Sequence, residues 1–305
     1  MLALAANFSA QNTTQMMNEM LQPYEFSSHS LMLKEGKLSY IKEGHGQPVL
    51  VFIHGLSSNG DAWFRNIKDL KNDFTCYAVD LPGYGRSYKE AEAFTPTYFA
   101  EVVKEFADKL SLKDVVLVGH SMGGQTAIKL AALYPDFVKK VVLVAPAGIE
   151  EFNEDEAKAL KTFTTKDNVM RTLPEQIEKN YQMNFFKMPS EAYKMIKDRL
   201  NIIKAKDFEA HALAIEKSVA GMLDDKVIAD LEKVKQPVLL LFAEDDRLIP
   251  NRFLHPTLSI QEVANKAQKT LSNSLLKMIP ESGHFLQFEK PAEVNKAIRE
   301  FVKEK

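Results

Sequence analysis

The residues with the clearest chemical potential are a serine and the two glycines that flank it at a distance of two positions. Residues 119–123 read Gly-His-Ser-Met-Gly, and the apolar run 115–118 precedes them. Because glycine lacks a Cβ, this spacing lets a strand turn sharply into a helix and raises the Ser121 hydroxyl above the sheet edge. The same turn leaves the backbone N–H of Met122 free to stabilise an oxyanion. The pattern predicts that Ser121 is a nucleophile.

A serine nucleophile needs a histidine as general base and a carboxylate that orients the histidine. Three consecutive acids at 244–246 follow the strand predicted at 237–243, and His284 follows the strand predicted at 275–279. The carboxyl ends of parallel strands meet at one edge of a sheet. We therefore expect His284 and one of these acids to lie close to Ser121.

The elements that must position these residues alternate between strands and helices along the chain. Such an alternation predicts βαβ units and a mostly parallel sheet covered by helices on both faces, with an antiparallel hairpin at the N-terminal edge. The apolar runs and helical periodicities predict strands at 29–34, 37–42, 48–53, 74–79, 115–118, 140–145, 237–243 and 275–279, and helices at 61–70, 96–110, 125–133 and 292–302.

The character of the chain changes between residues 148 and 235. Strand-like runs disappear there, while charged residues and helix formers increase, so we interpret the segment as an inserted helical cap. We expect its scattered aromatic and methionine side chains to form the core of the cap or to line an acyl pocket. These side chains are Phe152, Phe163, Met170, Met183, Phe185, Phe186, Met188, Tyr193 and Met195.

The predicted domain organisation has one core that the cap interrupts. Residues 1–22 are expected to be a tail or a truncated signal peptide, 23–147 the first part of the core, 148–235 the cap and 236–305 the second part of the core. Because residues 1–10 lack a basic region and a full apolar stretch, we expect a cytoplasmic protein, with an exported protein as the alternative.

Composition excludes several other classes of protein. The chain has 39 basic and 41 acidic residues and a net charge of −2, so nothing indicates a nucleic-acid partner. Cys76 is the single cysteine, so we expect a core residue with no disulfide. No apolar run approaches the ~18 residues that span a bilayer. The sequence indicates no oligomeric state.

The motifs together resemble the serine-dependent members of the α/β-hydrolase superfamily, in the branch of esterases and lipases. The resemblance covers residues from about 26 to the end and implies the α/β-hydrolase fold. It implies Ser121 as nucleophile, His284 as base and Asp246 as acid, because Asp246 precedes Pro250 by four positions in the family's motif. Ala243 stands where that motif has glycine, which leaves Asp245 and Glu244 as alternative acids.

The same resemblance implies an oxyanion hole and a reaction. His54-Gly55-Leu56 matches the family's oxyanion loop, so the backbone N–H groups of Leu56 and Met122 are the expected donors. Families that open epoxides or remove halides use Asp at the elbow, so Ser121 argues against both. We expect a small-molecule carboxylic ester, lipid-like or aryl, as substrate and no metal or organic cofactor. The substrate-binding residues are not predicted.

Two alternatives stay open at this stage. Carbon–carbon bond hydrolases of aromatic degradation share these motifs but usually carry Trp after the catalytic histidine, where this chain has Phe285. Some relatives with this fold bind ligands without catalysis, and an intact triad argues against that class. The cap arginines, Arg171 and Arg199, sit in no recognisable pattern.

The remaining histidines have structural interpretations. We expect His54 to orient the oxyanion loop and His120 to be a packing residue beside the nucleophile rather than a base. No motif includes the other four, which are His29, His45, His211 and His255.

Overall fold

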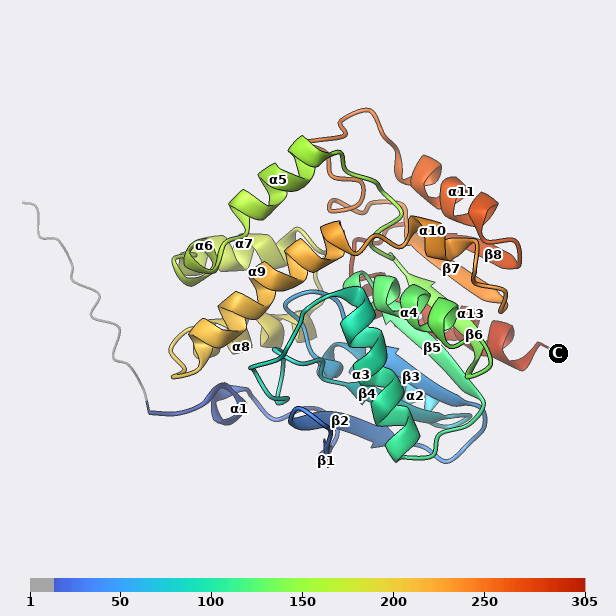
Figure 1. Ribbon diagram of the computed structural model, residues 1–305, viewed down its shortest axis with the longest axis horizontal. Coiled ribbons are helices and arrows are strands. Elements are labelled where there is room, and N and C mark those ends of the chain that lie inside the picture. The colour runs from blue at the N-terminus through green and yellow to red at the C-terminus, as the bar shows by residue number, and fades with distance from the viewer. Residues whose placement is uncertain (1–13, 305) are drawn as a thin grey trace, which may run out of the picture.

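The computed structural model describes residues 14–304 and is organised around one eight-stranded sheet (Figure 1). The strand order is β1-β2-β4-β3-β5-β6-β7-β8, with antiparallel pairing in β1–β2 and β2–β4 and parallel pairing elsewhere. The predicted α/β fold with its antiparallel edge hairpin is confirmed. The strands are β1 (Ser28–Met32), β2 (Lys37–Glu43), β3 (Val49–Ile53), β4 (Thr75–Val79), β5 (Val115–His120), β6 (Val138–Val144), β7 (Val238–Ala243) and β8 (Ser274–Ile279).

Helices cover both faces of the sheet because its central strands are apolar on both sides. Every residue of β3, β5 and β7 is buried, as expected for parallel strands with helices on each face. One face packs against α3 (Pro96–Lys109), α4 (Met122–Leu133) and α11 (Ile260–Thr270). The other face packs against α2 (Phe64–Leu70) and α13 (Pro291–Lys303).

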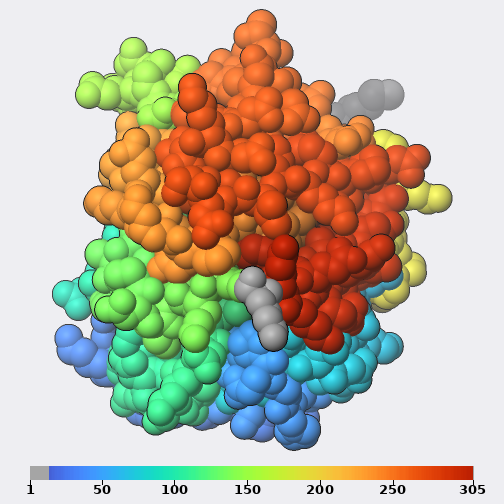
Figure 2. Space-filling view, turned by 90° about the vertical axis from the view of Figure 1, so that its right-hand side faces the viewer, coloured from blue at the N-terminus to red at the C-terminus, as the bar shows by residue number. Residues whose placement is uncertain are grey.

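The C-terminal helix α13 closes the second face against the N-terminal half of the chain. Figure 2 shows this red segment beside the blue and cyan residues of the first half. Arg299 pairs there with Asp69 at 2.9 Å and with Asp73 at 2.7 Å. The buried Cys76 lies in the same layer, as predicted for a core cysteine, and burial raises the pKa of its thiol to about 12.

The segment between β6 and β7 contains helices and no strand, and it lies beside the carboxyl ends of the strands (Figure 1). We keep the name cap for residues 148–235, a boundary that stays a prediction. None of the helices between residues 14 and 304 has the length and apolarity that crossing a membrane requires. The cap holds α5 (Glu154–Phe163), α6 (Lys166–Met170), α7 (Pro174–Gln182), η2 (Ser190–Ala192), α8 (Tyr193–Ile202), α9 (Phe208–Asp224) and α10 (Ile228–Leu231), and the core also has η1 (Gly60–Trp63) and α12 (Leu286–Glu289).

The part of the predicted tail that the structure describes packs against the cap. Residues 14–22 include the one-turn helix α1 (Met17–Met20) and pack against the cap, where Met17 and Leu21 are buried beside Phe208. Met17 and Leu21, four positions apart, present one apolar face to the cap, and the boundary of the predicted tail at residue 22 stays a prediction. Residues 1–13, where the signal-peptide alternative falls, lie outside the described residues.

Candidate active site

Ser121 lies at the tight turn between β5 and α4, as the glycine pattern predicts. Its backbone has φ 53° and ψ −117°, a left-handed conformation that is strained for a residue with a side chain. The turn is held by its neighbours, because the Ser121 N–H donates to Val144 O (3.0 Å) and the Ser121 carbonyl accepts from Gly124 N–H (2.8 Å). The fold thus maintains an unfavourable backbone conformation at the predicted nucleophile.

The two flanking glycines are required by close backbone contacts. A Cβ on Gly119 would lie 2.3 Å from the carbonyl oxygen of Gly123, and a Cβ on Gly123 would lie 2.2 Å from that of Ile53. Both distances are far below van der Waals contact. Any larger residue would therefore push the start of α4 away from strands β3 and β5.

The predicted acid, Asp246, and the predicted base, His284, meet beyond the ends of β7 and β8. Asp246 Oδ2 lies 2.8 Å from Nδ1 of His284, and Asp246 is 1% exposed. The other carboxylate oxygen, Oδ1, accepts the backbone N–H groups of Leu248 (2.8 Å) and Ile249 (3.0 Å). These bonds fix the carboxylate and leave Nε2 of His284 as the nitrogen available to a substrate or to a hydroxyl.

Neither alternative acid takes this position. Glu244 is exposed and Asp245 half-buried, and neither side chain bonds to His284 among residues 14–304. Asp245 is positioned by its backbone, whose N–H donates to Ser282 O at 3.1 Å. The geometry favours Asp246 as the acid, in agreement with the motif.

Ser121 and His284 line the same cavity, which has a volume of about 380 Å³. No hydrogen bond joins the Ser121 hydroxyl to the imidazole of His284 within the described chain. Catalytic contacts of this kind are often long in the free enzyme and shorten when substrate binds. Their roles as nucleophile and base therefore stay predictions that the arrangement favours.

The side chain of His120 positions His284 by a hydrogen bond to the backbone of His284. The ring of His120 is buried, and its Nε2–H donates to the carbonyl oxygen of His284 at 2.9 Å. Burial lowers the pKa of His120 well below its usual value, and the nearby His284 lowers it further. His120 is thus neutral and already bonded, so it is unsuited to act as the base, as the sequence analysis expects.

The predicted oxyanion loop lies directly against the elbow. A Cβ on Gly55 would stand 3.2 Å from Cβ of Ser121 and 2.9 Å from Nδ1 of His120, so only glycine allows this approach. The backbone N–H groups of Leu56 and Met122 donate to no group among residues 14–304. Two free donors beside the serine are what a developing oxyanion needs.

His54 supports this loop, as its position in the sequence suggests. Its Nδ1–H donates to Gly55 O at 2.7 Å, and its Nε2 accepts the backbone N–H of Leu81 at 3.0 Å. Burial lowers the pKa of His54, which keeps the ring neutral and able to both donate and accept. His54 therefore connects the oxyanion loop to the loop after β4.

The cavity walls are mostly apolar, and half of the residues that form them come from the cap. Of the side chains that the sequence analysis names, Phe152 lines the cavity and Met195 lines a neighbouring one. Phe163 is 77% exposed and so contributes to neither cavity. The sequence analysis missed the apolar wall from α9, which consists of Val219, Met222 and Leu223. Their i, i+3, i+4 spacing was the available signal.

Two histidines without a predicted role have structural partners. His255 stacks on Phe152, and its Nδ1 lies 2.5 Å from Glu150 and its Nε2 3.3 Å from Glu156. His211 donates from Nδ1 to Gly83 O at 2.8 Å. Within residues 14–304, no group of three or more His, Cys, Asp or Glu side chains could hold a metal ion.

Comparison with known proteins identifies the family. The protein-family model for the α/β-hydrolase fold matches residues 48–291 of this chain. The chain belongs to the α/β-hydrolase-fold family. It is 26% identical over 275 residues to an uncharacterized hydrolase, YugF, of Bacillus subtilis, which covers 85% of this chain and 91% of that protein.

Two further similarities fit this family assignment. The chain is 23% identical to the human monoacylglycerol lipase ABHD6, over 86% of this chain and 77% of that protein. The crystal structure of a probable hydrolytic enzyme from Pseudomonas aeruginosa superposes with a TM-score of 0.84 at 22% identity, covering 96% of this chain and all of that one. These relatives support a general hydrolase function.

Proposed function

We propose that this protein is a serine hydrolase that cleaves a small carboxylic ester with an apolar, lipid-like or aryl group. The observation that carries the proposal is the contact at 2.8 Å between Asp246 and His284, whose side chain lines the same cavity as the strained Ser121. A buried carboxylate fixes the tautomer of the imidazole, which can then take a proton at Nε2.

In the first half of the reaction, Nε2 of His284 takes the proton of the Ser121 hydroxyl while Oγ attacks the ester carbonyl carbon. The backbone N–H groups of Leu56 and Met122 stabilise the resulting oxyanion. The carbon–oxygen bond then breaks, and His284 returns the proton to the departing alcohol. This leaves an acyl group on Ser121.

In the second half, His284 deprotonates a water molecule that attacks the acyl carbonyl. A second tetrahedral intermediate uses the same two N–H donors. Its collapse releases the carboxylic acid and returns the proton to Ser121 Oγ. The apolar wall from α9 and from Phe152 favours an apolar acyl or aryl group in the cavity.

The test is a chain-length series of p-nitrophenyl esters and monoacylglycerols, with fluorophosphonate labelling of the same samples. Ser121→Ala is expected to lose the label and to reduce kcat by about 10⁴-fold or more, because Oγ is the attacking atom. Ser57→Ala, in the loop after the oxyanion residues, is the matched control and should keep both. Full turnover by Ser121→Ala would refute the proposal.

A further inference from the structure

A second cavity lies next to the catalytic one, on the side of the N-terminal segment and α8. It has a volume of about 270 Å³ and shares Leu56, Asn184 and Phe285 with the catalytic cavity. That volume is close to the lower limit of roughly 300 Å³ for small-molecule sites. Nothing in the proposed ester hydrolysis uses this space.

The second cavity contains a buried arginine with no polar partner. Arg199 is 8% exposed, and its Nη1 is fully buried with no hydrogen-bond acceptor. The side chain forms no ion pair and no hydrogen bond with any residue between 14 and 304. Its one strong contact is with the ring of Phe208, whose centroid lies 5.0 Å from the guanidinium carbon.

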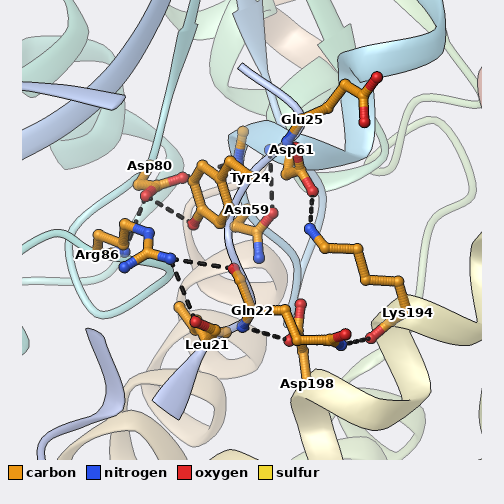
Figure 3. A network of polar contacts seen from close by, with 11 residues as sticks. Leu21, Gln22, Tyr24, Glu25, Asn59, Asp61, Asp80, Arg86, Lys194 and Asp198 are labelled. Atoms are coloured by element: carbon orange, nitrogen blue, oxygen red, sulfur yellow. Dashed lines mark hydrogen bonds and ion pairs between the residues drawn. The ribbon is translucent and has the colours of Figure 1, made fainter. Parts of the chain in front are cut away.

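The acidic residues that line the same cavity are engaged elsewhere. Asp198, next to Arg199 in the chain, accepts the N–H (2.8 Å) and the side-chain amide (3.1 Å) of Gln22 (Figure 3). Asp61 pairs with Lys194 in the same network. A third, Glu191, lies 3.8 Å from Arg65. None of them neutralises Arg199.

The histidine in this cavity does not offer a negative partner either. His211 uses Nδ1–H to donate to Gly83 O, and burial and the positive charge of Arg199 lower its pKa well below the usual value. Arg199 is therefore the single unpaired charge among the groups that line the cavity in the described chain. A cation–π contact does not replace the hydrogen-bond acceptors that a guanidinium loses on burial.

We propose that the second cavity binds a carboxylate or phosphate group on an apolar molecule, and that Arg199 anchors the anion. A guanidinium presents parallel N–H donors that match either group in a bidentate arrangement. The apolar part fits against Leu21, Ile202 and Ile215, which line the same space. The bound anion would supply the acceptors that Arg199 lacks.

The wall formed by the N-terminal segment is held in place by hydrogen bonds. Arg86 donates to the carbonyl oxygens of Leu21 (3.3 Å) and Gln22 (3.0 Å), and Figure 3 shows Gln22 reaching Asp198 on the cap. The pocket is thus built before a ligand arrives. A preformed site loses little free energy to ordering on binding.

The test is calorimetric titration of the full chain with octanoate, octyl phosphate and octanol, which share one apolar chain and differ in charge. We expect one or both anions to bind and octanol to bind at least 10-fold more weakly. In Arg199→Met the affinity for the anion should fall by about 10-fold to 100-fold, because charge-assisted hydrogen bonds are lost. Arg199→Lys, which keeps the charge but not the fork, should fall in between.

The matched control is Arg171→Met, because Arg171 is an exposed arginine of the same cap and should leave binding unchanged. A second readout is the melting temperature without ligand. Removing an unpaired buried charge should leave it unchanged or raise it. The proposal is overturned if neither anion binds, if octanol binds as well, if Arg199→Met binds normally, or if Arg199→Met melts several degrees lower.

Discussion

The two cavities that meet at Leu56 and Phe285 differ in how their polar groups are partnered. Beside the catalytic cavity, the carboxylate of Asp246 has three hydrogen-bond partners, and His120 donates a hydrogen bond to the backbone carbonyl of His284. In the second cavity, the guanidinium of Arg199 has no hydrogen-bond acceptor among residues 14–304. The carboxylate beside the catalytic cavity therefore has its hydrogen-bond partners before a ligand binds, whereas the guanidinium in the second cavity does not.

This contrast indicates a division of roles within the chain. The groups proposed for chemistry lie on loops of the sheet, where parallel strands fix their separation. Many of the groups that would contact the rest of a ligand come from the cap, among them Phe152 and the α9 residue Met222. We therefore expect substitutions in the core to change the rate and substitutions in the cap to change selectivity.

The largest expected effect that sharpens this contrast comes from the acid. Asp246→Asn should reduce kcat for a p-nitrophenyl ester by about 10⁴-fold, because the amide no longer fixes the tautomer or stabilises the imidazolium of His284. Asp245→Asn, one position away and without a bond to His284, should retain activity. Steady-state kinetics of the two variants show which carboxylate orients His284. If kcat falls only in Asp245→Asn, then Asp245 is the acid and the assignment of Asp246 is wrong.

The next effect concerns the residue that holds the base. His120→Phe should lower kcat by about 10-fold with little change in KM, because the carbonyl of His284 loses its donor and the ring position relaxes. The buried carbonyl left unpaired should also reduce the free energy of unfolding by about 1–3 kcal/mol. Activity assays measure the change in kcat, and urea unfolding measures the change in the free energy of unfolding. His45→Gln is the control, because His45 is exposed. An unchanged kcat would show that His120 only fills space.

A smaller effect is expected from the cap wall of the catalytic cavity. Met222→Ala should leave room in the cavity for a longer acyl chain. Because each additional buried methylene contributes roughly 0.8 kcal/mol, kcat/KM for decanoyl relative to butyryl esters should rise by several-fold. Met170→Ala, at a cap position that is 44% exposed, should leave the ratio unchanged. The ratio is measured from kcat/KM values for a series of p-nitrophenyl esters of increasing acyl length. Equal profiles for both variants would mean that α9 does not contact the acyl group.

The smallest effect is a dependence of stability on pH at the edge of the cap. Hydrogen bonding to Glu150 raises the pKa of His255, and Glu156 raises it further. A histidine with a raised pKa in the folded state contributes stability that is full below its unfolded pKa of about 6.5 and is lost as the pH rises through the folded value. The melting temperature, measured at pH values from 5.5 to 8.5, should therefore decrease less with rising pH for His255→Gln than for the parent chain.

The sequence was sufficient to predict the sheet and the positions of its polar ends. Buried parallel strands appear in the sequence as continuous apolar runs. The glycines at 119 and 123 indicate a sharp turn around Ser121, because few other roles require that spacing. The proximity of Asp246 to His284 could be expected for the same reason, since both follow neighbouring strands. The catalytic roles themselves await the kinetic tests.

Other features depend on contacts between distant segments and could not be predicted. The bond from His120 to the carbonyl of His284 joins residues 164 positions apart and involves a backbone atom, which carries no sequence signal. A one-turn helix such as α1 is not stable by itself, so its packing against α8 and α9 through Met17 and Leu21 depends on segments that are distant in the sequence. The lack of a polar partner for Arg199 within the described chain likewise depends on the folded surroundings and has no signal in the sequence.

The positive φ of Ser121 has a consequence for protein engineering. Glycine adopts that backbone conformation without strain, so replacing the serine with glycine should relax the turn. Selection for heat resistance alone would therefore favour variants that have lost the hydroxyl. A library screened in that way should be sequenced at position 121 before any of its members is kept as a more robust catalyst.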